Sequence, residues 1–404
     1  MSLPNSQLST LNSPLIPPGY KPTEVGVIPE DWDVRKLSEV SRKITDGDHV
    51  TPMRTVQGYY LLSARNVLNG RIDVSDVDYV GFAEYQRMKQ RCGPEAGDVL
   101  ISCSGTIGRV TVVPIGFECV LVRSAALAKI DPELANGVFL QFWLQGSRAQ
   151  WQIASSVNQG AQPNLFLNHI ERLLCPKPPL PEQSAIATAL SDVDALLAGL
   201  DQLITKKRDL KQAAMQQLLT GQTRLPGFYG EWEVKRLGDV VQIKKGQLIT
   251  SSTLKQGEIP AIAGGKQPAY FHAAANRFGR TVTISASGAS AGYVAIYDQP
   301  IFASDCSTIS ESESYCLEFI FYQLLCKQQT IYKAQTGGAQ PHVHAKDLNP
   351  FLFPVPPLSE QTAIAQVLTD MDAELSGLEQ RRDKTRALKQ AMMQELLTGR
   401  TRLI

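Results

Sequence analysis

The chain has 404 residues, a formal net charge of +1 and 43% hydrophobic residues. This length allows two or three domains with their own cores, and the composition excludes a largely disordered chain. No apolar run approaches the roughly 20 residues of a membrane-spanning helix, and the first residues lack a secretion signal, so we expect a cytoplasmic protein. The near-neutral charge gives no support to nucleic-acid binding by itself, because phosphate contacts need clustered Lys and Arg.

The cysteines are odd in number and scattered, and they form no C-x-x-C pair. This pattern predicts reduced, mostly buried thiols and excludes a disulfide or zinc framework. The seven cysteines are Cys92, Cys103, Cys119, Cys175, Cys306, Cys316 and Cys326.

Residues 1–25 form an N-terminal extension, and residues 26–178 form a first body of mixed α/β character. Within this body, "DVLISCSG" (98–105) predicts a buried strand that runs into a glycine turn. Residues 137–155 predict an amphipathic helix with an aromatic core face.

Residues 179–225 predict a first long helical region after a proline-rich segment, with Gly221 at its C′ position. Its apolar residues alternate spacings of four and three, which is the a/d pattern of a helix seam. These seam positions are Ile186, Leu190, Val193, Leu197, Leu200 and Ile204.

Residues 226–356 predict a second α/β body, with a strand in "TVTISASG" (281–288) and a helix over 317–334. Residues 357–404 predict the second long helical region, with Ser359 as N-cap and Gly399 at C′. Each helix would have about 38 residues and a length of roughly 57 Å. The second seam consists of Ile364, Leu368, Met371, Leu375 and Leu378.

The two halves of the chain are copies of one unit. "LKQAAMQQLLTGQTRL" (210–225) returns as "LKQAMMQELLTGRTRL" (388–403), and "EDWDVRKLSEV" (30–40) is similar to "GEWEVKRLGDV" (230–240). The helical tails match closely while the bodies diverge, so we infer that the tails have one task and the bodies have different ones.

An exposed a/d stripe of this length needs a partner helix. The chain order favours an antiparallel coiled coil of the two helices, with one body at each end and a pseudo-twofold axis between them. Two similar bodies held apart in this way suit a rod-like ligand such as DNA. The alternative is that each helix packs only on its own body.

Three short motifs have catalytic or metal-binding alternatives. Gly288–Gly292 fits the G-x-S-x-G nucleophile elbow around Ser290, with His342 and His344 as candidate bases. The equivalent turn at 105–108 is shorter and has no serine at this position, which favours a structural turn. His342-x-His344 lacks a further ligand at metal-site spacing, and Asn349-Pro350-Phe351 lacks one proline of an adenine methyltransferase tetrapeptide.

Each half of the chain has the same order: a body, a segment with P-E-Q or S-E-Q, and a long helix that ends in "LLTG". This repeated order resembles the specificity subunit of type I DNA restriction–modification systems. The stretches "DGDHVTP" and "LSARNV" resemble its target-recognition domains. The resemblance implies two such domains, each reading half of a bipartite DNA sequence. It further implies a non-catalytic subunit that assembles with two methyltransferase subunits carrying S-adenosylmethionine and with restriction–translocase subunits.

Polar loop side chains are the candidates for DNA contacts, since Arg, Lys, Asn and Gln read base edges and cations hold phosphates. In the first body they are Lys43, His49, Thr51, Arg54, Arg65, Asn66, Gln159 and Asn164. In the second body they are Lys244, Lys245, Gln247, Lys266, His342 and His344. Gln162 and Gln340 match between the copies, so we expect them to hold structure or backbone.

Two other functions remain open from the sequence. One is a serine hydrolase that uses the Ser290 elbow, and the other is a coiled-coil scaffold that binds no DNA.

Overall fold

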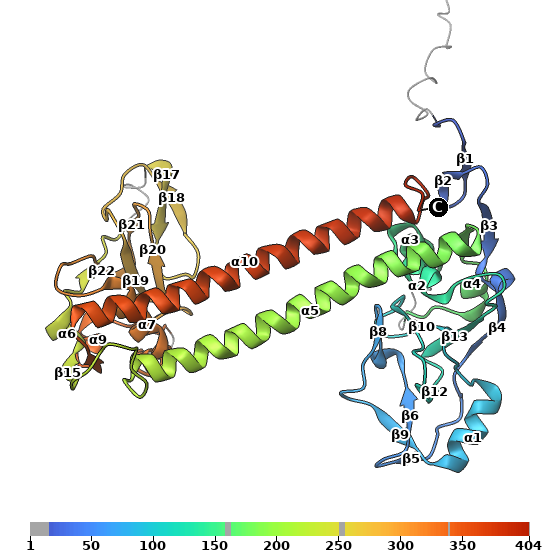
Figure 1. The fold of residues 1–404 in the computed structure, drawn as a ribbon, viewed down its shortest axis with the longest axis horizontal. Helices are drawn as coiled ribbons and strands as arrows, with labels where there is room; N and C mark the ends of the chain where they lie inside the picture. Colours follow the sequence, from blue (N-terminus) through green and yellow to red (C-terminus); the bar gives the residue numbers. More distant parts are fainter. Residues whose placement is uncertain (1–15, 158–162, 250–254, 338–339, 404) are drawn as a thin grey trace, which may run out of the picture. The chain divides into compact units, whose positions relative to one another are not determined.

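The computed structural model describes residues 16–157, 163–249, 255–337 and 340–403. The chain divides into two compact units (Figure 1). The first unit takes the described residues up to Gly199 together with those from Asp383 onward, and the second takes Leu200–Arg382. Each unit therefore contains one body, the first part of one long helix and the last part of the other.

The first body is built on two four-stranded sheets and three two-stranded ones. One large sheet has the order β11 (Val110–Val112), β10 (Val99–Ser102), β13 (Ala125–Ile130) and β4 (Ser41–Asp46), all antiparallel. The other has the order β12 (Cys119–Leu121), β6 (Tyr59–Leu62), β9 (Asp78–Val80) and β5 (Arg54–Thr55). The small pairs are β1 (Tyr20–Thr23) with β2 (Gly26–Pro29), β3 (Asp33–Lys36) with β14 (Leu174–Lys177), and β7 (Val67–Leu68) with β8 (Arg71–Ile72).

Short helices cover these sheets. They are η1 (Leu37–Val40), η2 (Ala64–Asn66), α1 (Phe82–Arg91), α2 (Gly137–Gln145), α3 (Ser147–Ser156) and α4 (Leu167–Glu171). The prediction of one helix over 137–155 is wrong in one respect: Gly146 has extended backbone angles and separates α2 from α3.

The second body repeats the plan with fewer elements. Its main sheet has the order β16 (Lys244–Lys245), β22 (Cys306–Ser310), β19 (Thr281–Ser285) and β20 (Val294–Tyr297). A three-stranded sheet has the order β18 (Tyr270–His272), β17 (Gln256–Ile262) and β21 (Phe302–Ala303), and β15 (Glu233–Arg236) pairs with β23 (Leu352–Val355). The helices are α6 (Leu237–Val240), α7 (Leu317–Cys326), α8 (Gln328–Lys333) and α9 (Ala345–Leu348). The helix predicted over 317–334 is again two helices, which meet at Lys327.

The buried strands follow the sequence prediction. All four residues of β10 and all five of β19 are buried, which is typical of a central strand covered on both faces. In the first unit these strands join a core around Trp32, Phe139 and Phe142. In the second unit the corresponding core contains Phe319 and Phe353.

The two long helices are α5 (Leu180–Leu219) and α10 (Leu358–Leu396), close to the predicted length. Ser359 is not the N-cap of α10, because the helix already begins at Leu358. Gly221 and Gly399 have φ angles of 73° and 68°, the left-handed conformation that ends helices. In the described part of the chain no helix combines the length and apolar character needed to cross a bilayer.

Within each unit the start of one long helix lies beside the end of the other, running in the opposite direction (Figure 1). In the first unit Ile186 and Leu190 of α5 join the core together with Leu396, the last residue of α10, and with Leu397 directly after it. The core of the second unit contains Ile364 and Leu368 of α10 together with Leu218 and Leu219 of α5. The helices thus pack both on a body and on each other.

The predicted seam side chains face inward. Seven of them are buried, namely Ile186, Leu190, Leu200, Ile204, Ile364, Leu368 and Leu375. The other four, Val193, Leu197, Met371 and Leu378, are half-buried.

Candidate nucleic-acid interface

A four-residue turn, Val122–Ala125, holds the polar loops of the first body together; we call it the hub turn. Its first amide donates a 3.0 Å hydrogen bond to Leu62 and its second donates a 3.2 Å bond to Asp48. The carbonyl of its third residue accepts a 2.8 Å bond from the Cys103 amide. A bond from the fourth amide to the first carbonyl closes the turn. Three separate loops are therefore fixed to one short segment.

A fourth loop joins through Cys103, whose carbonyl accepts a 2.9 Å bond from the Leu165 amide. The neighbouring residues Ser104 and Asn164 form a β-bridge. The interface of the first body thus combines loops 46–49, 62–65, 103–108 and 163–165.

The second body contains an equivalent hub, residues 303–306. Ser304 donates to Ile262, and the Asp305 carbonyl accepts from Ala286 at 3.1 Å. The first carbonyl of this hub accepts from Gln247 at 2.9 Å, and Val343 donates to Ala286 at 3.0 Å. The same four loops, here 245–248, 262–266, 286–292 and 340–343, meet in the same way.

One glycine at each hub allows the backbones to approach. A Cβ atom at Gly47 would lie 2.2 Å from the backbone of Leu121, and one at Gly246 would lie 2.0 Å from the Ser304 carbonyl oxygen. Only glycine fits at these contacts. The sequence shows both glycines, in "DGDH" and "KGQL", but not the reason for them.

In the first body the acidic loop residues are neutralised by α1. Arg91 pairs with Asp46 at 3.0 Å and Arg87 pairs with Asp48. Burial would raise the pKa of Asp48, but bonds from the Val50 amide and Arg87 outweigh it and leave the pKa below its ordinary value. The loop therefore presents no bare carboxylate to a phosphate.

His49 and Lys43 are exposed beside this loop. The Nε2 atom of His49 lies 2.7 Å from an Asp46 carboxylate oxygen, and the Lys43 ammonium donates to the Arg91 carbonyl at 2.7 Å. Thr51 is also exposed, and Asn164 is half-buried at its bridge with Ser104. Gln159 and Gln162 lie outside the described residues.

Arg54 and Arg65 share one carboxylate, that of Asp78, at 3.2 Å and 3.1 Å. Both guanidinium groups remain about half exposed. Asn66 is different: it is buried, and its amide nitrogen donates to two loop carbonyls while its oxygen accepts from Ser63. Asn66 therefore stabilises the loop and is no longer a candidate for a DNA contact.

The second body presents a more basic set of loops. Lys244, Lys245 and Gln247 are exposed, and none of the carboxylates that the structure describes pairs with either lysine. The Lys266 ammonium lies 5.6 Å from the centre of the Tyr293 ring, a cation–π contact. Gln340, which the sequence assigns to structure, is exposed.

His342 and His344 lie side by side on their loop. Their rings stack with centroids 5.7 Å apart and planes 13° apart. His342 also bridges Ser287, so it occupies in this body the place that Asn164 has in the first. Among the residues that the structure describes, no group of three or more His, Cys, Asp or Glu could hold a metal ion.

Ser290 does not lie on a nucleophile elbow. That motif places the serine between a strand and a helix. Here the serine lies between β19 and β20, which pair as antiparallel neighbours. Gly288 and Gly292 both have positive φ within the loop 286–293 that joins these strands.

Each unit joins body and helices through a Glu–Arg–Trp cluster, which we call the closing cluster. In the first unit Arg402, after α10, forms an ion pair with Glu182 at the start of α5, and the Trp32 indole donates to the same carboxylate at 3.0 Å. In the second unit Arg224 forms the same ion pair with Glu360. The Trp232 indole donates to that carboxylate, again at 3.0 Å. The sequence shows "TRL", "PEQ" and the tryptophans as repeated letters, and only the structure shows that they are in contact.

The helix pairs carry a second repeated cluster. In the first unit Lys389 pairs with Asp194 over the Phe142 ring. In the second unit Lys211 pairs with Asp372 over the Tyr322 ring.

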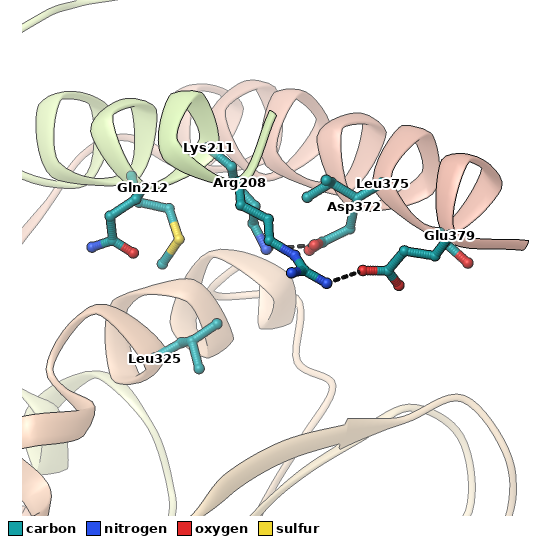
Figure 2. Close-up of a pocket in the computed structure, with 9 residues that line it drawn as sticks. Arg208, Lys211, Gln212, Leu325, Asp372, Leu375 and Glu379 are labelled. Carbon is teal, nitrogen blue, oxygen red and sulfur yellow. Dashed lines mark hydrogen bonds and ion pairs between the residues drawn. The ribbon is translucent and has the colours of Figure 1, made fainter. Parts of the chain in front are cut away.

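Beside this second cluster a hollow of about 590 Å³ separates α5, α10 and α7. Figure 2 shows Arg208 and Lys211 turned toward Glu379 and Asp372, with Leu325 of α7 below them. The four charges neutralise one another, so the hollow is a feature of helix pairing rather than a candidate ligand site.

A family model for the type I restriction modification DNA specificity domain matches residues 29–206 and again residues 229–385. A protein of Methanocaldococcus jannaschii named as the MjaX specificity subunit of a type I restriction enzyme is 25% identical over 433 residues. That match covers 95% of this chain and 97% of the relative.

Two solved structures share the fold. The S subunit of a type I restriction–modification system from M. genitalium superposes with a TM-score of 0.65 at 18% identity, covering 90% of this chain and 96% of that one. A chain from a study of complex assembly and conformational transition of the type I R-M system gives 0.53 at 20% identity, covering 92% and 99%.

Proposed function

This chain belongs to the family of type I restriction modification DNA specificity domains, and from that membership we propose that it is the specificity subunit of such a system. Each body reads one half of a bipartite DNA target. The target-recognition domains are residues 26–178 and 226–356, and the conserved helical regions are 179–225 and 357–404. Residues 1–25 form an extension outside this plan.

The observation that carries the proposal is the repeated hub. Both bodies bring four polar loops together by equivalent backbone bonds, yet the side chains on those loops differ. His49 and Asn164 stand where the second body has Leu248 and His342. A common scaffold with different polar side chains is what two readers of different sequences need.

We propose that α5 and α10 form an antiparallel coiled coil related by a pseudo-twofold axis, and that their length sets the spacing of the half-sites. Buried a/d side chains support this, as do the closing clusters and the Lys–Asp pairs, which recur at an offset of 178 residues. The interhelical pairs also keep one antiparallel register. Asp194 meets Lys389, Asp201 meets Arg382 and Lys211 meets Asp372.

We also propose that the helices dock two methyltransferase subunits and that restriction–translocase subunits complete the complex. Exposed leucines support a helical docking surface: Leu196, Leu203 and Leu210 recur every seven residues on α5, and Leu388 of α10 matches Leu210. S-adenosylmethionine would be held by the methyltransferase subunits, which modify adenine. The specificity subunit itself is non-catalytic and acts on DNA in the cytoplasm.

Methylation mapping tests this function. DNA from cells that express the chain with its methyltransferase partner should carry N6-methyladenine at one bipartite motif, and the purified subunit alone should consume no S-adenosylmethionine. A complete complex that binds no duplex preferentially would favour the scaffold alternative. Turnover of a generic ester by the purified chain, lost in Ser290→Ala, would favour the hydrolase.

A further inference from the structure

We propose that Arg123, at the hub turn, reads a guanine in the half-site of the first body. This inference rests on the proposed function and names a residue within that interface. Three observations support it. Arg123 lies where the loops meet, no carboxylate that the structure describes forms an ion pair with it, and hydrogen bonds hold its backbone.

Arg123 occupies the centre of the interface. It is the second residue of the turn to which loops 46–49, 62–65 and 103–108 are all hydrogen-bonded. Leu121 and Ala125 on either side are buried, whereas the Arg123 side chain is exposed. The Arg123 backbone thus lies where three of the loops that carry the other candidate contacts meet.

The charge of Arg123 is available to a ligand. Four other arginines near these loops, Arg54, Arg65, Arg87 and Arg91, pair with carboxylates. Within the described part of the chain no carboxylate forms an ion pair with Arg123. Because Arg87 and Arg91 already neutralise Asp48 and Asp46, those two acids do not compete for it.

The backbone of Arg123 is fixed before DNA binds. Its amide donates to Asp48, and the amides and carbonyls of its turn neighbours are also bonded. A guanidinium fork on a rigid turn is suited to bidentate hydrogen bonding with guanine O6 and N7, the commonest specific contact in the major groove. In the second body Ser304 makes the bond that Val122 makes here, and the next residue, Asp305, makes the bond of Ser124. No residue there corresponds to Arg123, so this contact would belong to one half-site alone.

The test uses the complex of this chain with its methyltransferase partner and duplexes carrying the mapped target. The wild-type complex is measured first, and a lack of preference for that target would end the proposed function itself rather than this inference. Guanines of the first-body half-site are then replaced one at a time by 7-deazaguanine, which lacks the N7 acceptor.

We expect one such replacement to weaken wild-type binding by about 5- to 100-fold, the range of a good bidentate contact. The substitution Arg123→Ala should weaken binding to the natural duplex by a similar factor. The 7-deazaguanine replacement should then weaken binding by this variant no further. Arg123→Lys should recover part of the affinity, and Arg35→Ala, an exposed arginine of β3, serves as the matched control with no effect.

Three results would overturn the inference. In one, Arg123→Ala folds and binds as wild type. In another, the loss is equal on all sequences and the salt dependence falls by about one charge, which indicates a phosphate contact. In the third, 7-deazaguanine weakens the variant and the wild type by equal factors at every position. Equal melting temperatures of variant and wild type verify that the hub turn is intact.

Discussion

At the scale of single residues, the closing clusters show how an arginine that follows a long helix stabilises a body. Glu182 and Glu360 are almost completely buried, and each carboxylate is neutralised by an arginine that follows the other long helix. A buried carboxylate without its partner costs several kcal/mol, since desolvation is no longer offset.

Arg402→Ala should therefore destabilise the first unit by about 2–4 kcal/mol, a range lowered because the Arg402 side chain is one-third exposed. Urea unfolding followed by tryptophan fluorescence should detect the change, since Trp32 belongs to the same cluster. Arg400→Ala removes an exposed pair with Glu395 and should cost at most about 0.5 kcal/mol. Equal effects of both substitutions would contradict the assigned role.

The cysteines behave as the sequence predicts, and burial determines their reactivity. Five are buried, and burial raises the pKa of each of these thiols to about 12. Cys316 and Cys326 are only half-buried. The five are Cys92, Cys103, Cys119, Cys175 and Cys306.

At pH 8, roughly one in 10,000 of the five buried thiols is a thiolate, which is the reactive form. Mild labelling of the native protein with iodoacetamide should therefore modify Cys316 and Cys326 first, as peptide mass spectrometry can show. The other five should react only in denaturant. Equal labelling of all seven in the native protein would exclude the observed burial.

At the scale of elements, the two long helices match each other closely while their contacts with the bodies differ in detail. Tyr322 donates a 2.8 Å hydrogen bond to Asp372 of α10, whereas Phe142 has no hydroxyl to offer Asp194. The helix pair is thus conserved between the copies, and the body surface that meets it has diverged.

If the helices set the half-site spacing, lengthening both should lengthen the spacer. Inserting one heptad after Gln202 and one after Gln380 adds seven residues at equivalent places, near the Asp201–Arg382 pair, and keeps both seams in phase. Each helix grows by about 10 Å, so methylation mapping should show a spacer about 3 base pairs longer with both half-sequences unchanged.

A single insertion in α5 alone provides the control. It moves one seam against the other, so we expect a lower melting temperature and no defined new spacer. A double insertion that folds, methylates and keeps the original spacer would mean that the helices do not set the distance.

At the scale of the whole molecule, each body forms a core with its own four-loop interface, so specificity should be modular. Exchanging residues 30–175 for those of a related subunit should change one half of the methylated motif and leave the other half and the spacer intact. One junction falls just before β3 and the other within β14, and these two strands pair with each other, so the exchange stays within one body.

The reciprocal exchange of residues 230–354, from just before β15 to a junction within its partner strand β23, should change only the other half. Methylation mapping of both hybrids checks the two assignments together. A hybrid in which both half-sequences change would show that the bodies do not read independently.

The sequence by itself determined the repeat, the two long helices with their seams, the buried strands and the family resemblance. These features depend on local periodicity and on letters that recur at a constant offset, both of which can be read without coordinates. The same local patterns predict a helix across Gly146 and an N-cap at Ser359. Both predictions are wrong, because the ends of elements depend on packing that no short pattern records.

Only the tertiary structure decided which polar side chains are exposed and available to contact DNA. Asn66 looks like a base-reading side chain but is buried and fully hydrogen-bonded, whereas Arg123 lies in an apolar stretch and is exposed on the hub turn. The closing clusters join Trp32, Glu182 and Arg402, which are far apart in the chain. Burial and ion pairing arise from such long-range contacts, and these are decided by how the chain folds back on itself rather than by any local pattern.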